Sequence, residues 1–110
     1  MLEKNFETLL IEAVDEALAS LGDSAKKAIY FHLKNKFQIS RRAIPNHLEI
    51  FEDGLEKIFG EGAQFLEILI MKGLYKRIGK EIEWHYDSKL VFSEYITAAK
   101  NTYIKTRTRN

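Results

Sequence analysis

Histidine is the side chain best suited to acid–base catalysis and metal binding near neutral pH, and this chain contains His32, His47 and His85. The three lie in different segments, and no two are four residues apart, the spacing that places two ligands on one face of a helix. His85 could meet Glu81 in a helix or Asp87 in an extended segment, but neither pair has a third ligand. We therefore expect no metal site.

A serine nucleophile needs a histidine base and an orienting carboxylate, and Ser88 has His85 and Asp87 beside it in the sequence. Ser88 also stands directly before an expected helix, where serine and aspartate are favoured as caps. Neither a strand-to-helix elbow nor a glycine-lined turn surrounds it. The capping interpretation is therefore preferred, and no catalytic residue is assigned.

The Gly60-Glu61-Gly62 sequence faintly resembles a phosphate-binding loop, because helix N-termini expose N–H groups to anions. A lysine followed by serine or threonine would complete that motif, but none follows, and Glu61 would repel a phosphate. The acidic residues recur on single faces of expected helices, which is typical of solvated surfaces and not of buried acid pairs. We expect a protein that is not an enzyme and that has no cofactor and no small-molecule substrate.

The charges alternate in blocks, although the formal net charge is only +1. Acidic residues dominate 1–25 and 49–67, whereas basic residues dominate 26–42 and 72–80. Helices with opposite blocks would complement one another within one chain or across a dimer. The basic residues of the second block, which are the candidate nucleic-acid contacts, are Lys26, Lys27, Lys34, Lys36, Arg41 and Arg42.

Nucleic-acid binding is the alternative function. Residues 25–37 and 46–59 have the outline of a helix-turn-helix, and the stretch after residue 71 resembles the end of a winged-helix domain. The second of these helices would present acids that repel phosphates, namely Glu49, Glu52, Asp53 and Glu56. The weaker form of this hypothesis has the 26–42 segment and the C-terminal tail contact phosphates without reading bases.

The positions of apolar residues predict the elements that would hold these side chains. The spacing of apolar residues predicts helices over about 6–21, 25–37, 46–59 and 63–78, and a last helix that Asp87 or Ser88 would cap and that runs to about 103. The 63–78 segment is apolar nearly all round, which predicts the central helix. Alternation at Ile82, Trp84 and Tyr86 predicts a short extended segment or a loop near 81–86.

Helix boundaries are predicted from particular residues. Gly22 suits the left-handed position after the first helix, and Asp23 or Ser24 would cap the second. Pro45 predicts a turn before the third helix, and Asn46 would open that helix with a capping box. We expect an all-α, compact bundle of about five helices, with residues 1–104 as one domain and 105–110 as a basic flexible tail.

Two helices carry more specific expectations. The apolar residues of 25–37 spread over more than half of the helix circumference, which predicts that this helix is largely buried. Gly54 lies inside the third helix, at a cost of about 1 kcal/mol relative to alanine. Either another backbone approaches Gly54 or the cost is tolerated.

The composition is that of one globular domain. The chain has 110 residues, 45% apolar and 30% charged, with one proline and no cysteine. The lack of cysteine excludes disulfides, thiolate metal sites and thiol catalysis. The N-terminal residues do not have the pattern of a signal peptide, and the apolar runs are too short to span a bilayer. We expect a cytoplasmic protein without a membrane partner.

Short motifs link the run from about residue 11 to residue 82 to a known family. They are Leu21-Gly22-Asp23-Ser24, Ile44-Pro45, Leu55-Glu56-Lys57-Ile58-Phe59-Gly60 followed by Gly62-Ala63, and Leu74-Tyr75 before Gly79. In these motifs the chain resembles a small archaeal family of helical domains, the fifth type of Nitrosopumilus output domain, which has no established activity. The chain departs from it at Glu61, where a proline would be expected. The resemblance implies a helical module that stands alone or forms the output part of signalling proteins.

Aromatic residues near the C-terminus exceed what a small core needs, which predicts a homodimer or a protein partner. The alternative is that the same side chains close the base of one bundle. We therefore expect a non-enzymatic module for protein interaction or signal output that self-associates. The aromatic residues assigned to its partner surface are Trp84, Tyr86, Phe92, Tyr95 and Tyr103.

Overall fold

The computed structural model describes residues 5–84 and 91–108, and this part of the chain is an all-α bundle without a β-strand. The α-helices are α1 (Phe6–Ala19), α2 (Asp23–Phe37), α3 (Leu48–Phe59), α4 (Ala63–Ile78) and α5 (Phe92–Thr108), with short 3-10 helices η1 (Arg41–Asn46) and η2 (Gly60–Gly62). The predicted all-α bundle of about five helices is confirmed. No helix within the described ranges is long and apolar enough to cross a membrane.

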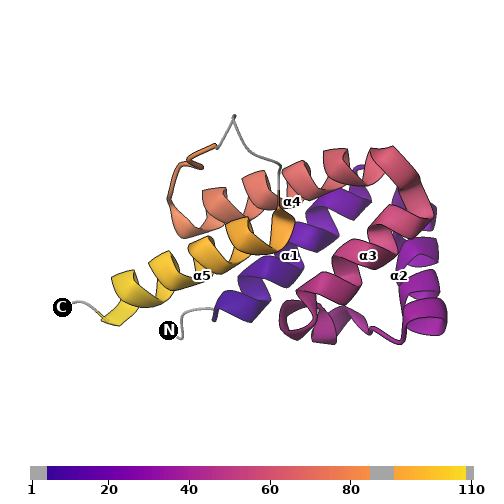
Figure 1. Cartoon of the computed structure of the whole chain (residues 1–110), viewed down its shortest axis with the longest axis horizontal. Coiled ribbons are helices and arrows are strands. Elements are labelled where there is room, and N and C mark those ends of the chain that lie inside the picture. Colours follow the sequence, from indigo (N-terminus) through magenta and orange to yellow (C-terminus); the bar gives the residue numbers. More distant parts are fainter. Residues whose placement is uncertain (1–4, 85–90, 109–110) are drawn as a thin grey trace.

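Helix α4 lies at the centre of the bundle, as its sequence predicts. It packs along α1 and also contacts α3 and α5, while α2 and α3 lie at one end of the molecule and the C-terminal part of α5 at the other (Figure 1). The core between α1 and α4 is fully closed to solvent. Its innermost side chains are Leu10, Val14, Leu18, Ile70, Met71 and Leu74.

The helix boundaries follow the predictions closely but differ at the caps. The backbone N–H of Thr8 donates to Oδ1 of Asn5, 2.8 Å away, so Asn5 caps α1, which the sequence reading missed. The second helix already includes Asp23, and no side chain caps it. Asn46 closes η1 and does not open α3, whose first turn has no side-chain cap. Both predicted caps are wrong, because each helix begins at a different residue from the one expected.

The predicted break before α3 is a short 3-10 helix. Gln38 ends α2 in the left-handed conformation at φ 53°, and η1 then carries Pro45 in its last turn. Ile44 of η1 is 1% exposed, so this segment belongs to the core and is not a surface turn. Pro45 cannot donate an i→i−3 hydrogen bond, and its fixed φ is compatible with a short 3-10 helix.

Helix α2 is mostly exposed, which contradicts the expectation that it is largely buried. Only Ile29 and Leu33 are buried along it, and Phe31 is 64% exposed. These two residues are four apart and form a narrow stripe against α1 and α3. Because α2 lies at the end of the bundle, its neighbours cover only part of its apolar surface, and Phe31 remains in solvent.

Gly54 marks the closest approach of α2 to α3. A Cβ atom at this position would lie 2.8 Å from Leu33 Cδ2 and 3.4 Å from a ring carbon of Phe37. The neighbours are side chains of α2, not the backbone that the first of the two alternatives proposed. The missing side chain lets Leu33, which is fully buried, fill the space between the helices.

The C-terminal region differs from its prediction. Helix α5 starts at Phe92 and continues to Thr108, so the tail expected from residue 105 is helical through 108. Residues 81–84 are neither helix nor strand. The remainder of the expected extended segment, including Tyr86, and the caps expected at Asp87 and Ser88 lie outside the described residues.

The C-terminal aromatic residues complete the core of one chain. Phe92 is fully buried, with its ring centroid 6.1 Å from that of Phe51, and Tyr95 is 8% exposed. The hydroxyl of Tyr75 donates to the backbone oxygen of Tyr95 at 2.8 Å, and the ring of Trp84 lies 5.6 Å from that of Tyr95. The assignment of Phe92 and Tyr95 to an exposed partner surface is wrong, because the folded chain already covers them.

Tyr103 and Trp84 are half-buried. The ring centroid of Tyr103 lies 6.1 Å from that of Phe6, which joins the end of α5 to the start of α1. Most of the surface of these aromatic residues is covered by the same chain. This agrees better with the alternative, in which they close a single bundle, than with a free dimer face.

Candidate functional site

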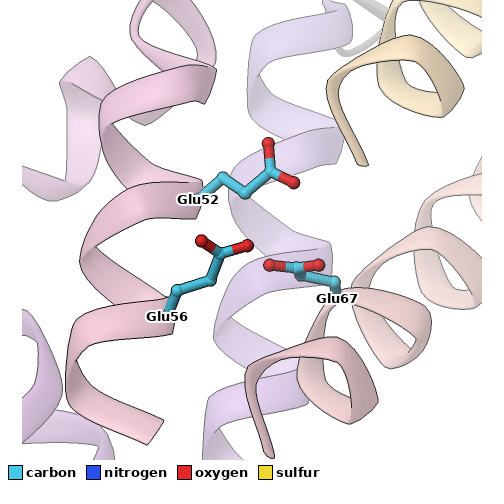
Figure 2. Close-up of side chains that lie close together, drawn as sticks. All are labelled: Glu52, Glu56 and Glu67. Carbon is cyan, nitrogen blue, oxygen red and sulfur yellow. The ribbon is translucent and has the colours of Figure 1, made fainter. Parts of the chain in front are cut away.

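Three glutamates from two helices converge in the structure. Glu52 and Glu56 are one turn apart on α3, and Glu67 lies in the second turn of α4. The chain reverses between the helices at Gly60, whose φ of 58° favours glycine, and then runs through η2. Each glutamate offers a carboxylate oxygen, and these oxygens all lie within 4.8 Å of one another (Figure 2).

Glu67 is the unusual member of this cluster. It is 4% exposed and is the only charged residue that is buried in the described part of the chain. Its Oε2 atom has no hydrogen-bond partner within the described structure. Burial, with a smaller contribution from the nearby charges of Glu52 and Glu56, raises the pKa of Glu67 from its ordinary 4.5 to about 7.

The sequence reading did not anticipate this cluster, because it placed all acidic side chains on solvated faces. The signal was nevertheless present: Glu67 follows Ala63 by four residues and precedes Ile70 by three, so it occupies a position in the buried stripe of α4. An acid at such a position is rarely buried without a partner. The helix period therefore identifies Glu67, whereas only the fold identifies Glu52 and Glu56 as its neighbours.

A solvent-filled hollow gives access to the glutamate cluster from the α3–α4 turn. Its wall contains Glu56 and Glu67 together with Glu61 of η2. The other lining residues are Gly60, Ala63 and Gln64. The cluster is therefore buried at Glu67 and open to water beside Glu56.

The acidic face of α1 pairs with basic residues from two other segments. Arg41 of η1 donates from Nε to Oδ1 of Asp15 at 3.0 Å and binds the other carboxylate oxygen through Nη2. Tyr30 donates its hydroxyl proton to the same Asp15, and Lys26 lies 3.9 Å away. Burial alone would raise the pKa of Asp15, but the hydrogen bonds from Arg41 and Tyr30, with the charges of Arg41 and Lys26, lower it.

A second set of pairs joins α1 to α4. Arg77 Nη1 lies 3.0 Å from Glu16 Oε1, and its Nε lies 3.7 Å from Glu12 Oε1. The acidic first block therefore pairs with the basic second and fourth blocks inside one chain. The prediction that the alternating blocks complement one another is confirmed for α1.

The candidate nucleic-acid residues fall into two groups. Lys26 and Arg41 are already engaged by Asp15. The others are exposed and make no ion pair with any described residue; they are Lys27, Lys34, Lys36 and Arg42. Lys27 and Lys34 lie one turn to either side of the exposed Phe31, so the outer face of α2 combines an aromatic ring with positive charge.

A broad hollow lies between the start of α3 and helix α5. Glu49 and Glu94 line it, and so does Ile50, which is 45% exposed. Its remaining lining residues are Pro45, Asn46, His47, Leu48, Ser93, Thr97, Ala98 and Asn101. This hollow is mildly acidic with an apolar patch, the opposite of the outer face of α2.

The other residues considered for chemistry are not brought together. The ring of His32 makes an edge contact with Phe31, at 6.0 Å between centroids, and His47 is exposed at the start of α3. His85 and Ser88 lie outside the described residues. The Gly60–Gly62 sequence forms η2 and connects two helices, as expected for a helix–helix turn.

Comparisons with known proteins give no family assignment. The chain matches no protein-family model, no curated protein and no solved structure. The resemblance to the archaeal output-domain family therefore stays a prediction, based on the motifs in the sequence.

Proposed function

We propose that this chain is a non-enzymatic protein-interaction module that self-associates through the outer face of α2. The observation that carries the proposal is the 64% exposure of Phe31 between Lys27 and Lys34. An exposed phenylalanine gains free energy when a partner covers it, and aromatic residues are frequent anchors of protein interfaces. The flanking lysines keep this face soluble and give it a preference for an acidic partner.

A second copy of the chain is the partner that we propose. The hollow between α3 and α5 offers the complementary chemistry, with Glu49 and Glu94 for the lysines and Ile50 for the aromatic ring. The two surfaces are different patches of the same molecule, so the contact is of the heterologous, head-to-tail type. Such contacts build closed rings or open chains according to the rotation between neighbouring copies.

Charge favours a protein partner over nucleic acid. Asp15 engages Lys26 and Arg41, so the charges of two of the candidate phosphate contacts are already paired within the chain. Helix α3 carries the exposed acids Glu49 and Asp53, and phosphates would be repelled there. The signal-output role implied by the family resemblance is compatible with a module that acts only by contact.

The test is light scattering behind size exclusion over a range of protein concentrations. We expect a mass that increases with concentration and association that weakens between about 50 mM and 500 mM salt, because exposed charges are then screened. Phe31→Ser should abolish association. Phe65→Ser is the matched control, because Phe65 is 65% exposed on a different helix, and it should leave association intact.

Two results would contradict the proposal. Equal behaviour of the two serine variants would show that Phe31 has no special role. A chain that is monomeric at every concentration, and that binds DNA only at low salt, would favour the nucleic-acid alternative instead.

A further inference from the structure

The carboxylates of Glu52, Glu56 and Glu67 lie so close together that ionising all three costs free energy. Their oxygens lie within 4.8 Å, and like charges at such distances repel one another strongly when one of them is removed from water. None of the basic residues in the described ranges forms an ion pair with Glu56 or Glu67. A cation at the point where the carboxylates meet would offset this repulsion.

The burial of Glu67 is a second observation, separate from the short distances between the three carboxylates. Its side chain is 96% covered by protein, Oε2 lacks a hydrogen-bond partner among the described residues, and the carboxylate points towards Glu52 and Glu56 (Figure 2). Buried polar atoms are nearly always paired, so an unpaired oxygen aimed into an acidic cluster indicates a ligand position. A solvated acid on a helix surface would show neither property.

We propose that Glu52, Glu56 and Glu67 bind one divalent cation that prefers oxygen ligands, with Mn²⁺, Mg²⁺ and Ca²⁺ as the candidates. Carboxylate oxygens without histidine or thiolate ligands suit these hard ions. The hollow beside Glu56 lets water molecules supply the coordination positions that three carboxylates leave open. Bound at this point, the ion ties α3 to α4 across their turn.

The proposal is tested by titrating the full chain with Mn²⁺ and measuring the unbound ion by its electron paramagnetic resonance signal. We expect one bound equivalent with a dissociation constant below about 1 mM, and a rise in the thermal unfolding midpoint when Mn²⁺ is added. Calorimetric titrations with Mg²⁺ and Ca²⁺ then rank the candidate ions.

Isosteric variants identify the ligands. Glu67→Gln should weaken Mn²⁺ binding at least about tenfold and remove the Mn²⁺-dependent rise in the unfolding midpoint. Glu52→Gln and Glu56→Gln should weaken binding in the same direction. The control Asp53→Asn changes an exposed acid of the same helix outside the cluster and should bind Mn²⁺ as the wild type does.

Three results would overturn the proposal. One is no detectable Mn²⁺, Mg²⁺ or Ca²⁺ binding at about 5 mM ion, well above the expected dissociation constant. The second is binding that Glu67→Gln leaves unchanged. The third is equal loss of binding in Asp53→Asn, which would indicate diffuse attraction to surface acids. The circular dichroism spectrum of Glu67→Gln should match that of the wild type, because glutamine keeps the size of the side chain, and this comparison separates loss of binding from loss of the fold.

Discussion

Replacing Glu67 by glutamine should stabilise the protein at alkaline pH when no divalent cation is present. The substitution keeps the size of the side chain and its helix propensity, and it removes the charge from a group that is 4% exposed. The glutamine amide can also donate hydrogen bonds to the neighbouring carboxylates. The change therefore removes the cost of the buried charge and leaves the size of the side chain unchanged.

The magnitude follows from the pKa of Glu67. The folded chain holds the Glu67 proton up to about pH 7, whereas the unfolded chain releases it near the ordinary value of 4.5. The free energy of unfolding of the wild type therefore falls as pH rises through this window and levels off above it. The full difference between the two pKa values corresponds to about 3 kcal/mol, which is the upper value expected at about pH 8.

Urea denaturation with a chelator, at about pH 4.5 and about pH 8, measures this effect. Glu67→Gln and the wild type should have similar free energies of unfolding at the lower pH, and the variant should be the more stable at the higher pH. Glu61→Gln, an exposed residue of the same hollow, is the control and should follow the wild type. A difference between Glu67→Gln and the wild type that does not depend on pH would refute the reasoning.

Asp15→Ala should lower the free energy of unfolding by about 2 kcal/mol, because it leaves Arg41 and the tyrosine hydroxyl without their charged acceptor; urea denaturation measures this. Gly54→Ala should destabilise by about 1 kcal/mol despite the higher helix propensity of alanine, because the new Cβ atom meets Leu33 at 2.8 Å; the thermal midpoint reports it. Phe92→Ala should cost about 3–5 kcal/mol at every protein concentration, because it empties a core position; denaturation at two concentrations distinguishes this from loss of a dimer.

Matched controls accompany these variants. Lys26→Ala removes only the distant 3.9 Å pair to Asp15 and should change stability by less than about 0.5 kcal/mol. Gly62→Ala places a Cβ atom at an ordinary 3.7 Å contact and should be nearly neutral. If Gly62→Ala and Gly54→Ala had equal effects, the close approach between α2 and α3 would not explain the glycine.

The period of the apolar residues predicted a helix correctly where the pattern within that helix and its flanking glycines set its bounds. The bounds of α4, 63–78, agree with the structure because Ala63 follows a glycine turn and Gly79 ends the helix in the left-handed conformation, at φ 75°. The pairing of charge blocks was also predictable, because opposite charges on adjoining helices meet whenever those helices pack.

The predictions of burial were wrong where the surroundings of a side chain depend on how other helices pack around its own helix. Whether Phe31 is buried depends on α2 lying at the end of the bundle, which no pattern within 25–37 contains. Phe92 and Tyr95 were assigned to a partner because the sequence does not tell how α5 crosses α3 and α4. Glu67 was detectable from its place in an apolar stripe, but its two acidic neighbours depend on the α3–α4 turn.

Self-association through the outer face of α2 is tested most directly by exchanging charges between the two proposed surfaces. One variant carries Lys27→Glu and Lys34→Glu, and the other carries Glu49→Lys and Glu94→Lys. Each variant alone should associate at least about tenfold more weakly than the wild type, because like charges then face each other. Light scattering on an equimolar mixture should show association restored, since each altered surface finds its complement on the other variant. A mixture that remains as weakly associated as its components would contradict the proposed contact.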